Sequence, residues 1–176
     1  MNVYNFIKKY PDIANKSGVY AISNPDSRKG QHFLKVGETS NFTLRFTGSL
    51  GSSYTTAWAI QPFLVHAVML VPNIKHHGWT ATRGKDGKSK EGTSISRTKV
   101  REKEVHQQLE DSPFVTRIRR PATRDRKARV TEWFESKQDD TELVITHGFE
   151  PVWRKHGDCR LYVCDTWDCK LVTRED

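Results

Sequence analysis

Short apolar runs separated by polar turns predict the strands of this chain. Residues 18–23 (GVYAIS) and 33–36 (FLKV) flank the turn segment NPDSRKG, so they are expected to pair as a hairpin. The most apolar run, PFLVHAVMLVP at 62–72, predicts a central strand. ELVIT at 142–146 is a further strand candidate, and RLYVCDTWDCKLV at 160–172 has the pattern of a C-terminal hairpin.

Helical spacing predicts three helices, over residues 3–10, 42–46 and 99–111. In the second helix, Phe42, Arg45 and Phe46 fall at positions i, i+3 and i+4. Arg45 is therefore expected to share a face with two aromatic rings. Thr39 or Ser40 can cap this helix through a side-chain oxygen.

These elements follow one another without an internal repeat and predict an α+β fold. We expect a small, mainly antiparallel three-stranded central sheet flanked by helices, with a C-terminal β-hairpin extension. The stretch 73–98 is rich in Gly, Ser, Thr and Lys, which predicts a long basic loop. Residues 1–140 would form the main domain that contains this loop, and residues 141–176 a β-rich extension packed on the same domain.

The composition adds a strong charge bias. The chain of 176 residues has a net charge of +8 and a pI of about 9.5, which favours a polyanionic partner such as nucleic acid. No apolar run approaches the ~20 residues needed to cross a bilayer, and the first residues lack the apolar stretch of a signal peptide. The sequence therefore predicts a soluble, intracellular protein with no membrane partner, cytoplasmic in a prokaryote or in a phage- or virus-infected cell.

Three cysteines lie near the C-terminus, at Cys159, Cys164 and Cys169. An odd number of cysteines in an intracellular chain does not suggest a disulfide framework. His156 adds a fourth candidate zinc ligand, but the C-x4-C-x4-C spacing differs from the C-x2-C pairs typical of zinc knuckles. Structural zinc is therefore not expected. A zinc-stabilised DNA-binding adaptor is the alternative that the cysteines leave open.

Two neighbouring predicted strands carry an unusual pair of motifs, Gly-Val-Tyr at 18–20 and Lys-Val-Gly at 35–37. Arg45 follows the second motif by eight residues, and a helix that contains glutamate follows the third strand. In their order and spacing these motifs resemble the GIY-YIG nucleases, over roughly residues 17–135. The tyrosine of the family's second motif is Lys35 here, as in some members that include restriction enzymes.

The resemblance implies a metal-dependent endonuclease that hydrolyses DNA. The EKEVHQQL helix and the later TEWF segment are similar to the branch found in phages and large DNA viruses. A sequence-specific enzyme of the restriction or homing type is favoured. Two alternatives stay open, a catalytically silent nucleic-acid-binding module of the same fold and a structure-specific repair nuclease.

Tyr20, Lys35 and Arg45 have the chemistry that phosphodiester hydrolysis requires. A phenol with a reference pKa of about 10 is a poor base at neutral pH, and a neighbouring cation lowers that pKa. If Lys35 lies beside Tyr20 on the adjacent strand, Tyr20 is predicted to act as general base or base relay with a pKa below 10. The motif glycines would let backbone and phosphate approach closely, and Arg45 would clamp the scissile phosphate with two parallel donors. In the alternative, Tyr20 is a half-buried strand residue, Lys35 is solvated and Arg45 packs its stem on aromatic rings.

The third predicted helix offers Glu102 and Glu104, which lie about 200° apart around the helix. Glu102 precedes Val105 by three residues and Leu109 by seven, which is also the phase of the family's glutamate. We therefore predict Glu102 as the sole protein ligand of a Mg²⁺ ion, or of Mn²⁺ in its place, which would stabilise the leaving 3′ oxygen. In the alternative, Glu102 pairs with a nearby Arg or Lys. His106, one turn further on, would contact the phosphate, orient Glu102 or be a core histidine.

Two basic segments, 117–129 and 75–99, have the composition of surfaces that contact phosphates. Double-stranded DNA is the expected partner, with a homodimer if a palindromic site is cut. Trp79 would wedge or stack on a base. The predicted DNA-binding residues are Lys75, Trp79, Arg83, Lys85, Arg117, Arg119, Arg120, Arg124, Arg126 and Arg129. In the alternative, these segments form a solvated basic surface.

Overall fold

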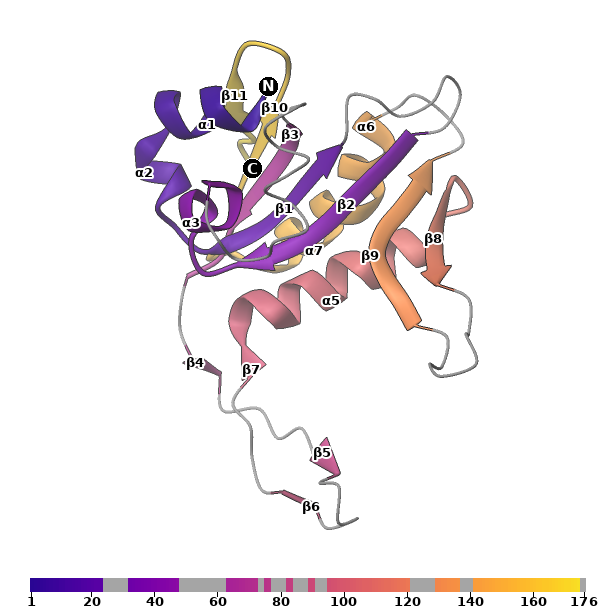
Figure 1. The fold of residues 1–176 in the computed structure, drawn as a ribbon. Coiled ribbons are helices and arrows are strands. Elements are labelled where there is room, and N and C mark those ends of the chain that lie inside the picture. Colours follow the sequence, from indigo (N-terminus) through magenta and orange to yellow (C-terminus); the bar gives the residue numbers. More distant parts are fainter. Residues whose placement is uncertain are drawn as a thin grey trace.

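The protein is built around a seven-stranded antiparallel sheet, seen in the computed structural model in Figure 1. The strand order is β11-β10-β3-β1-β2-β9-β8. The strands are β1 (Gly18–Ser23), β2 (His32–Thr39), β3 (Leu64–Leu70), β8 (Val115–Arg120), β9 (Arg129–Ser136), β10 (Arg160–Cys164) and β11 (Cys169–Leu171). The structure describes residues 1–23, 32–47, 63–72, 75–76, 82–83, 89–90, 95–120, 129–136 and 141–174.

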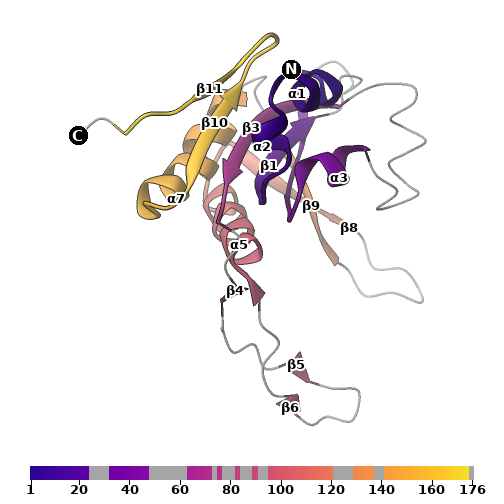
Figure 2. The same cartoon turned by 90° about the vertical axis from the view of Figure 1, so that its left-hand side faces the viewer.

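Helices cover both faces of the sheet, and Figure 2 shows the two groups on either side of it. The helices are α1 (Val3–Lys9), α2 (Pro11–Ala14), α3 (Phe42–Thr47), α5 (Arg97–Glu110), α6 (Thr141–Val144), the π-helical turn η1 (Ile145–Phe149) and α7 (Glu150–Lys155). The first three lie on one face, and α5, η1 and α7 lie on the other. The α+β class is confirmed.

The alternation of side chains along β1 sorts the core into two parts. Val19 and Ala21 are fully buried in a cluster that includes Val105 and Leu109 of α5. Tyr20 points to the opposite face, into a second cluster with residues of α1 and α3. β1 therefore contributes to both clusters, and the strand order places it in the middle of the seven strands.

The expected three-stranded sheet is wrong, because two hairpins extend it. β9 pairs with β2 and β8 pairs with β9, while β10 pairs with β3 and β11 pairs with β10. The segment 141–176 therefore contributes two strands to the same sheet. Pairing of β9 with β2 and of β10 with β3 joins segments far apart in sequence and leaves no local pattern along the chain. The sequence predicted the C-terminal hairpin but neither β8 nor β9.

Two other expectations differ from the structure. Part of the expected loop 73–98 forms short strand pairs, β4 (Lys75–His76) with β7 (Ile95–Ser96) and β5 (Thr82–Arg83) with β6 (Ser89–Lys90). The ELVIT segment is helical, within α6 and η1. Its buried residues continue at helical spacing into Phe149 and Val152, a period that a five-residue run cannot reveal.

The C-terminal hairpin is confirmed, but it contains a disulfide that was not expected. Cys164 and Cys169 lie directly opposite each other on β10 and β11 and are bonded. Their pairing follows from the strand register, because two cysteines either side of a tight turn come together when the hairpin forms. Cys159 is free and buried, and burial raises the pKa of its thiol to about 11. No helix in the described part of the chain is long and apolar enough to cross a membrane.

Candidate active site

Tyr20 and Gly37 face each other across the β1–β2 ladder. A Cβ atom on Gly37 would lie 2.6 Å from the Tyr20 hydroxyl oxygen, so the tyrosine ring crosses the strand where Gly37 has no side chain. At Gly18, a Cβ would lie 2.2 Å from the Met69 carbonyl oxygen and 2.8 Å from the Phe42 ring. The two motif glycines thus make room for side chains and backbone of the protein itself. The sequence predicted close approach of both backbone and phosphate, and the backbone approach is seen at Gly18.

We expect Gly37→Ala to lower the free energy of unfolding by about 1–3 kcal/mol, because the new methyl group must displace the Tyr20 ring. Chemical denaturation measures this loss. Gly157→Ala is the matched control, since a Cβ at that exposed position would meet only the tip of Arg174, at 3.3 Å. Its effect should stay within roughly 0.5 kcal/mol. Equal effects of the two substitutions would contradict the close Tyr20–Gly37 contact.

Helix α3 brings Arg45 to the Tyr20 hydroxyl. Asn41 caps this helix, because its side-chain oxygen accepts a hydrogen bond from the Leu44 amide at 2.9 Å; the predicted caps were Thr39 and Ser40. Arg45 Nε donates to the Tyr20 oxygen at 3.1 Å. The rings of Phe42 and Phe46 lie edge-on to the Tyr20 ring, with centroids 6.3 and 5.2 Å away. The first motif and the arginine are therefore brought together.

Tyr20 is fully buried, with only 1% of its surface exposed, and it is a neutral phenol at neutral pH. Burial raises the pKa of Tyr20 above 10, and the positive charges of Lys35 and Arg45 with the Arg45 hydrogen bond offset only part of this rise. The sequence correctly predicted the direction in which Lys35 acts. It was wrong on the net result, because the depth of burial depends on the rings of α3.

Lys35 is 4% exposed and pairs with a residue that the sequence reasoning missed. Its Nζ lies 3.1 Å from a carboxylate oxygen of Glu132 on β9. Burial alone would raise the pKa of Glu132, but the nearby charges of Lys35, Lys99 and Arg45 lower it below its usual range. Glu132 is therefore ionised at neutral pH. Its only signal in the sequence is its place in the TEWF segment similar to part of the nuclease family.

Glu102 is 1% exposed and lies on the buried stripe of α5 with Val105 and Leu109, as its helical phase predicts. One carboxylate oxygen forms an ion pair with Lys99, and the other has no hydrogen-bond partner among the described residues. Burial raises the pKa of Glu102, and Lys99 offsets part of this rise. Glu104 points elsewhere, toward Arg101, Lys155 of α7 and His156 directly after it.

The unpartnered oxygen of Glu102 fits the expectation of a divalent cation at this place. An ionised carboxylate oxygen buried without a partner is costly, and a cation would satisfy it. Mg²⁺ accepts a single carboxylate when waters and phosphate oxygens complete its shell. Within the described ranges, no group of three or more His, Cys, Asp or Glu side chains could hold a metal. A metal here would therefore depend on Glu102 and on the substrate.

Both ring nitrogens of His106 are hydrogen-bonded within the protein. Nε2 donates to the Val36 carbonyl oxygen at 3.0 Å, and Nδ1 accepts from Arg117 at 3.0 Å. These partners fix the neutral tautomer, since a carbonyl only accepts and a guanidinium only donates. Burial lowers the pKa of His106 to about 4. The geometry favours the core histidine among the three roles that the sequence left open.

The predicted DNA-binding residues separate into half-buried, exposed and undescribed positions. Arg117 is half-buried and bonded within the protein, because its guanidinium also donates to the Thr131 carbonyl at 2.7 Å and pairs with Glu110. Arg119 is exposed on β8, and Arg120 lies opposite Arg129 at the end of the β8–β9 ladder. Lys75 and Arg83 belong to β4 and β5. Trp79, Lys85, Arg124 and Arg126 lie outside the described residues.

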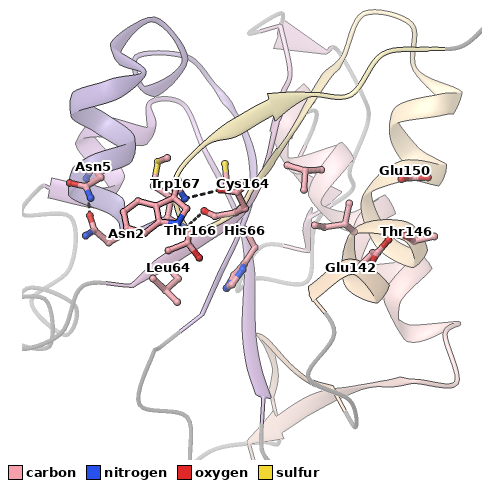
Figure 3. Close-up of a pocket in the computed structure, with 14 residues that line it drawn as sticks. Asn2, Asn5, Leu64, His66, Glu142, Thr146, Glu150, Cys164, Thr166 and Trp167 are labelled. Carbon is pink, nitrogen blue, oxygen red and sulfur yellow. Dashed lines mark hydrogen bonds between the residues drawn. The ribbon is translucent and has the colours of Figure 1, made fainter.

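A separate cavity of about 780 Å³ opens beside the β10–β11 turn (Figure 3). Trp167, which is 82% exposed, lies at its rim, and Glu142 and Glu150 line its far side. His66 lines it too and shares a 2.5 Å hydrogen bond with Ser23. The cavity lining includes no residue of the candidate active site.

The chain matches no protein-family model, no curated protein and no solved structure. The resemblance to GIY-YIG nucleases therefore rests on residues of this sequence alone, namely the two motifs, Arg45, the Glu102 helix and the TEWF segment.

Proposed function

We propose that the protein is a metal-dependent endonuclease of the GIY-YIG type that hydrolyses phosphodiester bonds in double-stranded DNA. The observation that carries this proposal is the contact between Arg45 and Tyr20 above Gly37, three positions that sequence spacing had singled out independently. A buried tyrosine hydroxyl needs a hydrogen-bond partner, and here that partner is a guanidinium, the group that also matches phosphate oxygens. The buried carboxylate of Glu102, with one unpartnered oxygen, supplies the metal-binding group that this chemistry requires.

In the proposed reaction, the oxygen of a water molecule bonds to phosphorus while the bond to the leaving 3′ oxygen breaks. The water loses a proton through the Tyr20 hydroxyl, which acts as base relay, and the 3′ oxygen takes up a proton from solvent. Arg45 binds the scissile phosphate, since its guanidinium matches phosphate oxygens with parallel donors. The Tyr20 oxygen orients the water by accepting its hydrogen bond, and Lys35 and Arg45 stabilise negative charge that develops around it. Glu102 would hold Mg²⁺ or Mn²⁺, which when bound supplies positive charge at the leaving oxygen.

Incubation of the purified protein with mixed plasmid and phage DNAs tests the proposal, with Mg²⁺ in one series and EDTA in the other. Discrete fragments in Mg²⁺ alone would support a sequence-specific enzyme of the restriction or homing type, as a homodimer if the site is palindromic. A smear would indicate a nuclease without such specificity. DNA that stays intact in Mg²⁺ would contradict the proposal.

A catalytically silent DNA-binding module is the second candidate, and one observation favours it. Tyr20 and Glu102 are each 1% exposed and are paired within the protein. Such a module would shift DNA in a gel with or without Mg²⁺ and would leave it uncut.

Salt dependence should separate Arg117 from the other arginines of the two basic segments. Binding that neutralises phosphates weakens with salt, with a log–log slope of about −0.9 per phosphate. Replacing Arg119, Arg124, Arg126 and Arg129 together by Ala should flatten this slope, as measured by fluorescence anisotropy. Arg117→Ala should leave the slope unchanged and lower the free energy of unfolding by about 1–3 kcal/mol, because buried partners lose their donor. An unchanged slope in the quadruple variant would assign these four residues to a solvated surface.

A further inference from the structure

The β9 strand bends where it passes the active site. Arg117 of β8 lies opposite Phe134, but Arg119 lies opposite Val130, so residues 131–133 face the single residue Ile118. A bulge of this kind interrupts pairing and redirects side chains. The β2–β9 ladder also ends beside it, at the pair Lys35 and Trp133.

Specific hydrogen bonds hold this bulge in place. The Thr131 hydroxyl donates to the Ile118 carbonyl at 2.6 Å and accepts from the Trp133 amide at 3.2 Å. Arg117 Nε donates to the Thr131 carbonyl at 2.7 Å. The bend is thus a fixed feature of the strand, with Glu132 at its middle.

We propose that Glu132 is a positioning residue, which the β9 bulge aims at Lys35 to hold the Lys35 ammonium in the active site. This inference rests on the proposed function. The Lys35 side chain is 5% exposed and its Nζ lies 3.1 Å from Glu132, whose side chain is 37% exposed. A buried ammonium group needs a charged or hydrogen-bonded partner to remain protonated and fixed.

The electrostatics agree with this assignment. Burial is the main cause that raises the pKa of Tyr20 and of Glu102, and the charge of Glu132 adds to both rises. The Glu132 carboxylate is therefore close enough to act on both residues. The charged and titratable groups around the Lys35–Glu132 pair come from three further elements, namely Tyr20 of β1, Arg45 of α3, and Lys99, Glu102 and His106 of α5.

The test compares Glu132→Gln, Glu132→Asp, Lys35→Met and the double variant Lys35→Met/Glu132→Gln in single-turnover cleavage. Glu132→Gln should slow cleavage roughly 10- to 100-fold at neutral pH, because Lys35 is no longer held in place. Glu132→Asp should restore part of the rate. The double variant should be no slower than Lys35→Met alone, since Glu132 acts through Lys35. Glu135→Gln, a carboxylate on the same strand opposite Phe33 and Thr116, should cleave as the wild type does.

The pH profile is the readout that a merely structural role would not move. Loss of the carboxylate disfavours the protonated amine, so the Lys35 ammonium should be lost at a lower pH in Glu132→Gln than in the wild type. If cleavage needs the Lys35 ammonium, the cleavage rate should fall where this group deprotonates, and that fall should lie at a lower pH in Glu132→Gln than in the wild type. Nitrogen-detected NMR of the lysine amines gives the Lys35 pKa directly, in protein without DNA.

Failure of the inference differs from failure of the proposed function. Wild-type cleavage with an unchanged rate in Glu132→Gln, or losses that multiply in the double variant, would overturn the positioning role and leave the nuclease intact. A wild-type protein that cuts no DNA would end the proposed function. In that case the NMR comparison still decides the inference, and an equal Lys35 pKa in wild type and Glu132→Gln would refute it.

Discussion

Glu102→Gln should abolish Mg²⁺-dependent cleavage and at the same time stabilise the protein. The amide keeps the shape of the side chain but cannot supply the negative charge that a divalent cation requires. It also removes a buried carboxylate that has one unpartnered oxygen. We expect a gain of about 1 kcal/mol in the free energy of unfolding at pH 7, because burying an unsatisfied charged group is costly.

The pH dependence of that gain gives an internal check. Burial raises the folded-state pKa of Glu102 above 4.5, its value in the unfolded chain. As pH rises above 4.5, the folded carboxylate must ionise in a buried place, so the wild type loses stability relative to Glu102→Gln. The stability difference should therefore shrink as pH is lowered toward 4.5, as measured by urea denaturation.

Glu104→Gln is the control. It should retain cleavage and lose stability, since Glu104 pairs with Arg101 and His156. Reversed results would mean that Glu104 is the metal ligand.

Tyr20→Phe should slow cleavage by two to four orders of magnitude, the range that positioned acid–base groups typically contribute, ~10²–10⁴-fold. The ring and its contacts with Phe42 and Phe46 are retained, while the oxygen that Arg45 contacts is lost. Folding and DNA binding should change little, so the loss should fall in the single-turnover rate at saturating protein. Near-normal cleavage by Tyr20→Phe would remove this residue from the mechanism.

The wild-type pH profile should also reflect the burial of Tyr20. Burial raises its pKa above 10, so the phenolate forms only above that pH despite Lys35 and Arg45. The cleavage rate should therefore show no plateau assignable to Tyr20 ionisation between pH 7 and pH 10. A plateau in that interval that disappears in Tyr20→Phe would show that DNA binding lowers this pKa.

The parts of the site that local sequence could predict are those fixed by short-range geometry. Apolar runs on either side of a polar segment predict that strands 18–23 and 33–36 pair, and a 3.6-residue helical period puts Glu102 on the same stripe as Val105 and Leu109. These features depend on patterns within short segments of the chain. The motifs could therefore be found without knowledge of the sheet.

The remaining features depend on contacts between distant segments. Glu132 reaches Lys35 because β9 pairs with β2 and bulges beside it, and neither event has a local signature. Arg117 belongs to a basic run, yet its guanidinium donates hydrogen bonds to Thr131 and His106 of the same protein. The pKa of Tyr20 follows from how deeply helix α3 buries it, which neighbouring charges alone do not determine.

The most direct test of the central claim is a single time course of DNA cleavage, in Mg²⁺, by wild type and Glu102→Gln at equal amounts of bound DNA. The variant serves as a blank for contaminating nucleases, because it passes through the same purification. The proposed function predicts cleavage by the wild type that EDTA stops, and no cleavage by Glu102→Gln. Equal cleavage by both proteins, or intact DNA with both, would contradict it.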